Sequence, residues 1–123
     1  MNINRVLAAV VAVLLLPAIA VAAGDSVSRY RLVADPSNTD NCRLLDPVLA
    51  RPHTVTVKTG DVEITSAGGV EGRMREVRAG VYSVTFELSG QRLDVVVDLS
   101  VAPKTLTVSE PQFGCKWRAS SEQ

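Results

Sequence analysis

The chain has 123 residues, with 13 basic and 13 acidic side chains and a single histidine. This balanced charge lacks the strongly basic surface that a nucleic-acid-binding domain needs, so that class of function is excluded. A chain of this length accommodates one domain, and its two cysteines are the only thiols available for a cross-link or a metal site.

The N-terminal segment has the three parts of a secretory signal peptide. Arg5 supplies a positive charge, an apolar run extends over 6–19, and the small residues 20–22 form an A-x-A cleavage pattern. A membrane anchor is the alternative, but it needs about 20 apolar residues, and Pro17 lies where an anchor would have a bulky side chain. We therefore expect cleavage of residues 1–22. The remainder, 23–123, is expected to be one domain in the periplasm or secreted, without membrane attachment.

A connection rich in Pro, Asn and Asp follows the first expected strand, which lies around 29–33. Pro36, Pro47 and Pro52 argue against central strands up to residue 52, because Pro cannot donate to a strand ladder. The oxygen-rich stretch 35–41 has an alternative interpretation as a calcium loop, but it lacks the residue order and the distal Glu of an EF-hand. Turn formation explains these residues, and we expect no metal site.

Residues 54–108 alternate between polar and apolar with a period of two, which is typical of half-buried strands. Turn signals recur about every 10 residues, and such short links join antiparallel neighbours. They fall at 59–60, 68–69, 79–80, 89–90 and 103–104. The pattern predicts an all-β fold, a small antiparallel meander of six to eight strands that forms a barrel or a two-layer sandwich. No helix longer than two turns is expected after residue 30.

The turns also predict the register, because a slip of one residue moves every side chain to the other face of a sheet. Two-residue loops at 59–60 and 89–90 and a four-residue loop at 102–105 all place apolar side chains opposite one another. The predicted pairs are Val57 with Val62, Phe86 with Leu93, Val101 with Leu106, and Leu99 with Val108.

The segment 71–78 does not fit this pattern. A two-residue loop at 79–80 puts Arg75 opposite Val84 on the core face, and a three-residue loop puts Glu76 there instead. A charge in that place indicates an edge strand protected by inward charge, or a bulge. The alternative is an arginine cluster that binds an anionic ligand or partner. Its candidate residues are Arg73, Arg75 and Arg78.

The two cysteines, Cys42 and Cys115, lie near opposite ends of the expected domain. In an oxidising compartment such a pair forms a disulfide, and the C-x-x-C spacing of a redox couple or a thiolate metal site is absent. The bridge closes a loop of more than 70 residues, and on the chain-entropy model it stabilises the fold by roughly 4 kcal/mol. Trp117 is expected to pack over it in the core.

No catalytic group is predicted. His53 is the only histidine, and no G-x-S-x-G elbow accompanies it, so we interpret it as a half-exposed residue at the start of a strand. Asp94 and Asp98 share one strand face at about 13 Å, too far apart for the paired carboxylates of a glycosidase. We expect neither enzymatic activity nor a cofactor.

The combination of a signal segment, a small antiparallel sheet, one long-range disulfide and a Trp near the last Cys resembles small periplasmic proteins, including bacterial lysozyme inhibitors. The resemblance implies an inhibitor that presents a loop containing Ser66, Gly68 and Gly69. The sequence there, Ser66-Ala67-Gly68-Gly69, departs from the Ser-Gly motif of those inhibitors. The residues themselves predict a non-enzymatic binding or interaction module with a protein or small-molecule partner in the envelope. A hydrolase inhibitor is the alternative, and a small envelope hydrolase is the third hypothesis.

Overall fold

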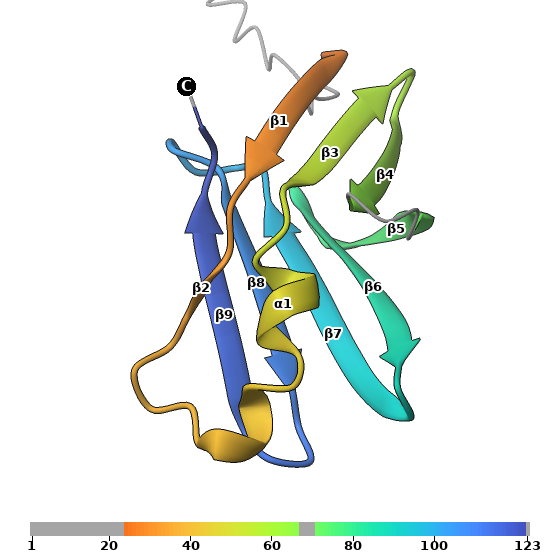
Figure 1. Ribbon diagram of the computed structural model, residues 1–123. Coiled ribbons are helices and arrows are strands. Elements are labelled where there is room, and N and C mark those ends of the chain that lie inside the picture. The colour runs from red at the N-terminus through yellow and green to blue at the C-terminus, as the bar shows by residue number, and fades with distance from the viewer. Residues whose placement is uncertain (1–23, 67–70, 123) are drawn as a thin grey trace, which may run out of the picture.

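The computed structural model describes residues 24–66 and 71–122. Their strands form one curled antiparallel sheet, a half-barrel, in the order β1-β3-β4-β5-β6-β7-β8-β9-β2 (Figure 1). The strands are β1 Ser26–Tyr30, β2 Val33–Ala34, β3 His53–Lys58, β4 Asp61–Ser66, β5 Glu71–Arg78, β6 Val81–Leu88, β7 Gln91–Asp98, β8 Thr105–Glu110 and β9 Cys115–Ser120. The predicted all-β antiparallel fold is confirmed. The described residues hold nine strands instead of six to eight, because the N-terminal strand is split into β1 and β2.

The split first strand joins the two ends of the sheet. Only Arg31 and Leu32 separate β1, which pairs with β3, from β2, which pairs with β9. Tyr30 also forms a bridge with Ser121, beyond the end of β9. The predicted signal segment, residues 1–22, lies outside the described residues.

The proline-rich connection contains two short helical segments, a 3₁₀ helix at Asp40–Cys42 and α1 at Asp46–Leu49. Pro47 lies in the first turn of α1. A backbone N–H there has no intrahelical acceptor, so the absence of an N–H in Pro costs no hydrogen bond. α1 faces the concave side of the sheet, where Val48 and Leu49 line a cavity together with side chains of β6, β7 and β8 (Figure 1). None of the helices in the described ranges is long and apolar enough to cross a membrane.

Two of the three predicted hairpin registers are confirmed. Val57 lies opposite Val62 in β3–β4, and Phe86 lies opposite Leu93 in β6–β7. Both loops have positive φ at their two central residues, which are Thr59-Gly60 and Ser89-Gly90. This is the type I′ conformation, whose twist matches that of the flanking strands.

The predicted β7–β8 register is wrong. The observed pairs are Val97 with Leu106 and Val95 with Val108. β7 ends at Asp98 because the carboxylate of Asp98 accepts hydrogen bonds from both the backbone N–H and the hydroxyl of Ser100, which turns the chain out of the ladder. Leu106 pairs with Val97 instead of Val101, a shift of an even number of residues along β7. Because side chains alternate between the two faces with a period of two, the inward faces are as predicted. Val101 instead lies in the connection and is 43% exposed.

β5 is the strand at which the sheet bends. Its first half pairs with β4, its second half pairs with β6, and a register shift between Glu76 and Arg78 marks a bulge. Arg78 lies opposite Val81, as the two-residue loop predicts, but the bulge places Glu76 opposite Tyr82, so neither predicted register continues along β5. β5 lies between β4 and β6 in the order of the sheet, so it is not an edge strand of the sheet, and the bulge interpretation is confirmed.

The core lies on the concave face. Tyr30, Val55, Val97 and Leu106 have no exposed surface. In contrast, four side chains of β6 that the alternation predicts in the core are only partly buried, namely Tyr82, Val84, Phe86 and Leu88. β6 loses its β5 neighbour beyond Ser83, so this part of the half-barrel is less well covered.

Candidate functional site

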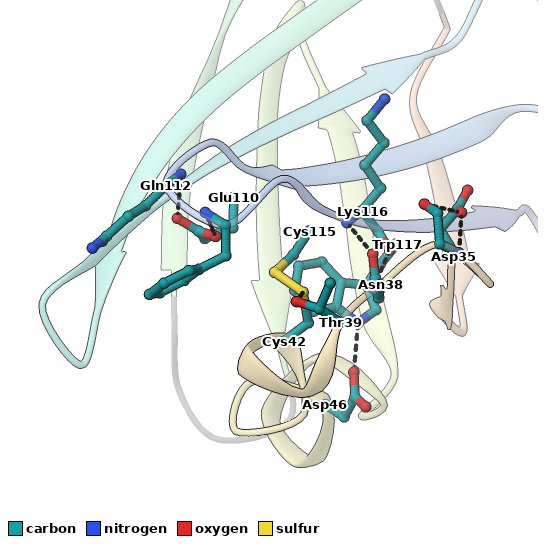
Figure 2. The surroundings of a disulfide bond; sticks show 12 residues. Asp35, Asn38, Thr39, Cys42, Asp46, Glu110, Gln112, Cys115, Lys116 and Trp117 are labelled. Atoms are coloured by element: carbon teal, nitrogen blue, oxygen red, sulfur yellow. Dashed lines mark hydrogen bonds between the residues drawn. A yellow bond between two sulfur atoms is a disulfide. The ribbon is translucent and has the colours of Figure 1, made fainter.

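The predicted disulfide is confirmed, with the Cα atoms of Cys42 and Cys115 5.7 Å apart and both residues 1% exposed. It ties the 3₁₀ helix to the first residue of β9 (Figure 2). Trp117 is 2% exposed beside the bridge, and its indole N–H donates to Oδ1 of Asp46 at 2.8 Å. The prediction that this tryptophan belongs to the core is therefore confirmed, and the bridge with its surroundings is structural.

The oxygen-rich stretch 35–41 holds the connection against β9. The side-chain amide of Asn38 donates to the carbonyl of Lys116 and accepts from its N–H, both at 2.8 Å (Figure 2). Asp35 accepts hydrogen bonds from the hydroxyl and N–H of Ser37, and these bonds lower the pKa of Asp35. These groups act as turn and strand partners. In the described ranges no three His, Cys, Asp or Glu side chains are grouped to hold a metal ion.

Glu110 is a buried carboxylate that sequence reasoning missed. It is 1% exposed, and its two oxygens accept hydrogen bonds from the backbone N–H groups of Gln112 and Phe113 at 2.6 and 2.9 Å (Figure 2). A buried charge is tolerated where such bonds replace water. The sequence signal was a Glu directly before the turn at 111–114. The burial of Glu110 is explained by its hydrogen bonds within the β8–β9 turn.

The interpretation of His53 as half-exposed is wrong. It is 6% exposed, and Nε2 lies 3.0 Å from the carbonyl oxygen of Leu49, which can only accept, so Nε2 carries the proton. Burial lowers the pKa of His53, and the hydrogen bond to Leu49 offsets part of that effect. His53 is therefore neutral near pH 7. It begins β3 opposite Ser66, the last residue of β4.

His53 lines a cavity of about 70 Å³ that opens between α1, the end of β4 and the last half of β6. Its other polar lining residues are Ser66 and Glu87. The remaining lining side chains are all apolar, namely Val48, Leu49, Ile64, Phe86, Leu88, Leu93, Val95 and Val108. Since a cavity of about 150 Å³ accommodates benzene and each liquid water occupies about 30 Å³, this space fits a small aliphatic group. It is too small to enclose a whole cofactor.

Gly72 of β5 explains how Phe86 borders this cavity. A Cβ atom added at Gly72 would lie 2.4 Å from Cζ of Phe86, so the aromatic ring rests directly on the glycine backbone. Sequence reasoning missed this contact. A glycine inside an otherwise charged strand was the available signal, because such a glycine often marks a close approach.

The three arginines of the predicted anionic patch are spread along β5. Arg73 forms an ion pair with Asp61 at 3.0 Å. Arg78 follows the bulge and lies near Asp98, whose pKa is lowered by the hydrogen bonds from Ser100 and, to a lesser extent, by the charge of Arg78. Arg75 lies opposite Ser83. Two of the three arginines therefore have acidic neighbours.

The predicted partner loop is described only at its first residue. Ser66 ends β4 and lines the cavity, whereas Gly68 and Gly69 lie outside the described residues. No family model, curated protein or solved structure matches the chain. The candidate site is thus defined by its own geometry, as the apolar cavity between α1 and β6.

Proposed function

We propose that the chain is an exported, non-enzymatic binding module that takes up an aliphatic group of its partner in the cavity between α1 and β6. The observation that carries this proposal is an open cavity with a mostly apolar lining at the edge of the hydrophobic core. The buried disulfide is compatible with export, because such bonds persist in oxidising compartments.

The size of the cavity sets the kind of group that it binds. Complete burial of a valine- or leucine-sized side chain contributes about 1.5–3 kcal/mol, and 70 Å³ leaves room for little more. Such a contribution is insufficient for a stable complex, because association itself costs several kcal/mol. The partner must therefore make further contacts around the opening.

Methyl NMR with a short branched alcohol, 2-methylpropanol, tests the cavity directly. We expect the methyl resonances of Ile64, Leu88 and Leu93 to shift on titration. Val48→Phe places a ring at the opening from a half-exposed position of α1 and is expected to abolish the shifts. The matched control is Val27→Phe, at a site on β1 that is 66% exposed. Cavity methyl resonances that do not respond to the alcohol would show that the proposal is wrong.

A protein inhibitor of a hydrolase such as lysozyme is the alternative, supported by the resemblance described above. In this hypothesis the loop that begins at Ser66 enters the partner's active site. An inhibition assay with micromolar protein tests it, and unchanged lysozyme activity removes it.

A small envelope hydrolase is a third hypothesis, supported by the fact that His53 and Ser66 are opposite each other and both line the cavity. Against it, Nε2 of His53 is engaged by Leu49. Hydrolysis of a nitrophenyl ester that His53→Gln abolishes would overturn the non-enzymatic assignment.

A further inference from the structure

The cavity is bordered by an edge of β6 that has no paired strand among the described residues. β5 and β6 pair from Arg78 with Val81 to Arg75 with Ser83, whereas β6 continues to Leu88. Figure 1 shows that the two strands meet at their shared turn and then diverge. Within the described residues, no strand pairs with 84–88 on the side away from β7.

The β6–β7 turn determines which backbone groups of β6 point away from β7 at this edge. In a two-residue turn the carbonyl of Leu88 accepts from the N–H of Gln91, which makes these residues a hydrogen-bonded pair. Antiparallel pairs alternate, so Phe86 and Val84 also bond to β7. Thr85 and Glu87 therefore direct their backbone N–H and C=O groups toward the opening, and both residues are exposed. Such an edge is a template for another strand.

We propose that an extended peptide of a partner protein adds as a strand to the 84–88 edge of β6 and inserts one aliphatic side chain into the cavity. This inference rests on the proposed function and supplies the further contacts that the cavity alone lacks. Strand addition derives affinity from main-chain hydrogen bonds and specificity from pockets for alternate side chains. Here the edge and a pocket lie together, because Phe86 and Leu88 of this segment line the cavity.

The charged side chains near this edge indicate which residues the peptide carries on either side of its inserted aliphatic residue. Arg92, the β7 neighbour of Glu87, is held by Asp94 at 3.1 Å. Within the described residues no ion pair involves Glu87 or Glu71. Opposite charges favour cross-strand pairing, so basic residues are expected on both sides of the inserted aliphatic residue.

The same carboxylates disfavour the two other occupants of this edge. Continuing the β5–β6 register from Arg75 and Ser83 would place Glu71 opposite Glu87, and like charges directly opposite each other destabilise a sheet. A second copy of the chain would bring a second Glu87 carboxylate to the same edge. A basic extended peptide avoids both conflicts.

The test uses the labelled peptide acetyl-Lys-Leu-Lys-Leu-Lys-amide and two backbone-methylated versions, one methylated at the leucine nitrogens and one at the lysine nitrogens. In a strand only one of these two sets of N–H groups faces β6. We expect the parent peptide to bind in fluorescence anisotropy, and one methylated peptide to bind at least tenfold more weakly. If methylation of the lysine nitrogens weakens binding, the peptide adds antiparallel to β6. If methylation of the leucine nitrogens weakens binding, it adds parallel.

Protein variants separate the contributions to binding. Glu87→Gln and Val48→Phe are each expected to weaken the parent peptide at least fivefold. Glu122→Gln removes a carboxylate that pairs with Arg31 and is expected to leave the affinity unchanged. A leucine-to-serine peptide with the same charges controls for non-specific attraction and is expected to bind no better than the methylated one.

The outcomes distinguish this inference from the proposed function. If both methylated peptides bind like the parent and Val48→Phe removes binding, the cavity is a binding site and strand addition is wrong. If no peptide binds while 2-methylpropanol still shifts the cavity methyl resonances, strand addition is wrong and the proposed function stands. If the alcohol has no effect either, both fail. A dimer that blocks the peptide in sedimentation experiments would identify a second copy as the occupant and overturn the inference.

Discussion

Replacing the disulfide should remove a large part of the stability of this fold. The perturbation is the double substitution Cys42→Ala and Cys115→Ala, which leaves no unpaired thiol in positions that are 1% exposed. For a sequence separation of 73 residues, the chain-entropy model gives about 4.4 kcal/mol at 25 °C. A typical domain has only 5–15 kcal/mol of stability, and about 4 kcal/mol corresponds to a decrease of roughly 20 °C in the melting temperature.

The structure also predicts where the loss begins. Without the bridge, the connection 35–52 is held by the pairs Asn38–Lys116 and Asp46–Trp117, by the bond between His53 and Leu49, and by the buried leucines Leu45 and Leu49. Hydrogen exchange is expected to accelerate at Leu45 and Leu49 before the amides of β6 and β7. Trp117 is the only tryptophan, so its fluorescence reports on the same region and should shift toward longer wavelength.

Circular dichroism melts of the parent and the double variant, together with hydrogen exchange, form the assay. Melts of the parent in a strong reductant, with free thiols counted, provide the matched control. An unchanged melting temperature in the double variant would refute the entropic argument. Earlier exchange in the β6–β7 hairpin than in the connection would refute the assignment of the bridge to the connection.

Three further perturbations test individual contacts. Asn38→Ala removes two hydrogen bonds to Lys116 and should lower the free energy of unfolding by about 1–3 kcal/mol in urea titrations, whereas an unchanged value would show that water replaces them fully. Glu110→Ala leaves two backbone N–H groups of the β8–β9 turn without acceptors and should destabilise by about 2–4 kcal/mol, with Glu110→Gln milder; equal effects would contradict a hydrogen-bonding role. Burial lowers the pKa of His53 below its unfolded value of about 6.5, so the unfolded chain binds more protons as the pH falls. This contribution to stability should be fully present above about pH 6.5 and be lost as the pH falls below it, whereas His53→Gln should lack this decrease; equal pH dependence in both proteins would refute it.

Local sequence patterns were sufficient for the antiparallel strands between 53 and 110, apart from the bulge in β5, and for the two hairpins with type I′ turns. In these hairpins the glycines Gly60 and Gly90 define the turn, and a two-residue loop leaves one possible register. The same reasoning failed at the β7–β8 connection, because Asp98 takes hydrogen bonds from Ser100 and ends the strand early. Alternation alone does not reveal where a strand ends.

The sequence by itself determined the fold class, the inward faces of the strands that alternate regularly and the pairing of Cys42 with Cys115, because period-two alternation and the presence of just two cysteines restrict the alternatives. Only the tertiary structure decided that β5 carries a bulge and leaves β6 after Ser83. It also decided that His53 is buried against Leu49. The physical reason is that bulges, burial and cavities depend on how α1 and the two halves of β5 pack against distant strands, and such packing leaves no periodic signal in the chain.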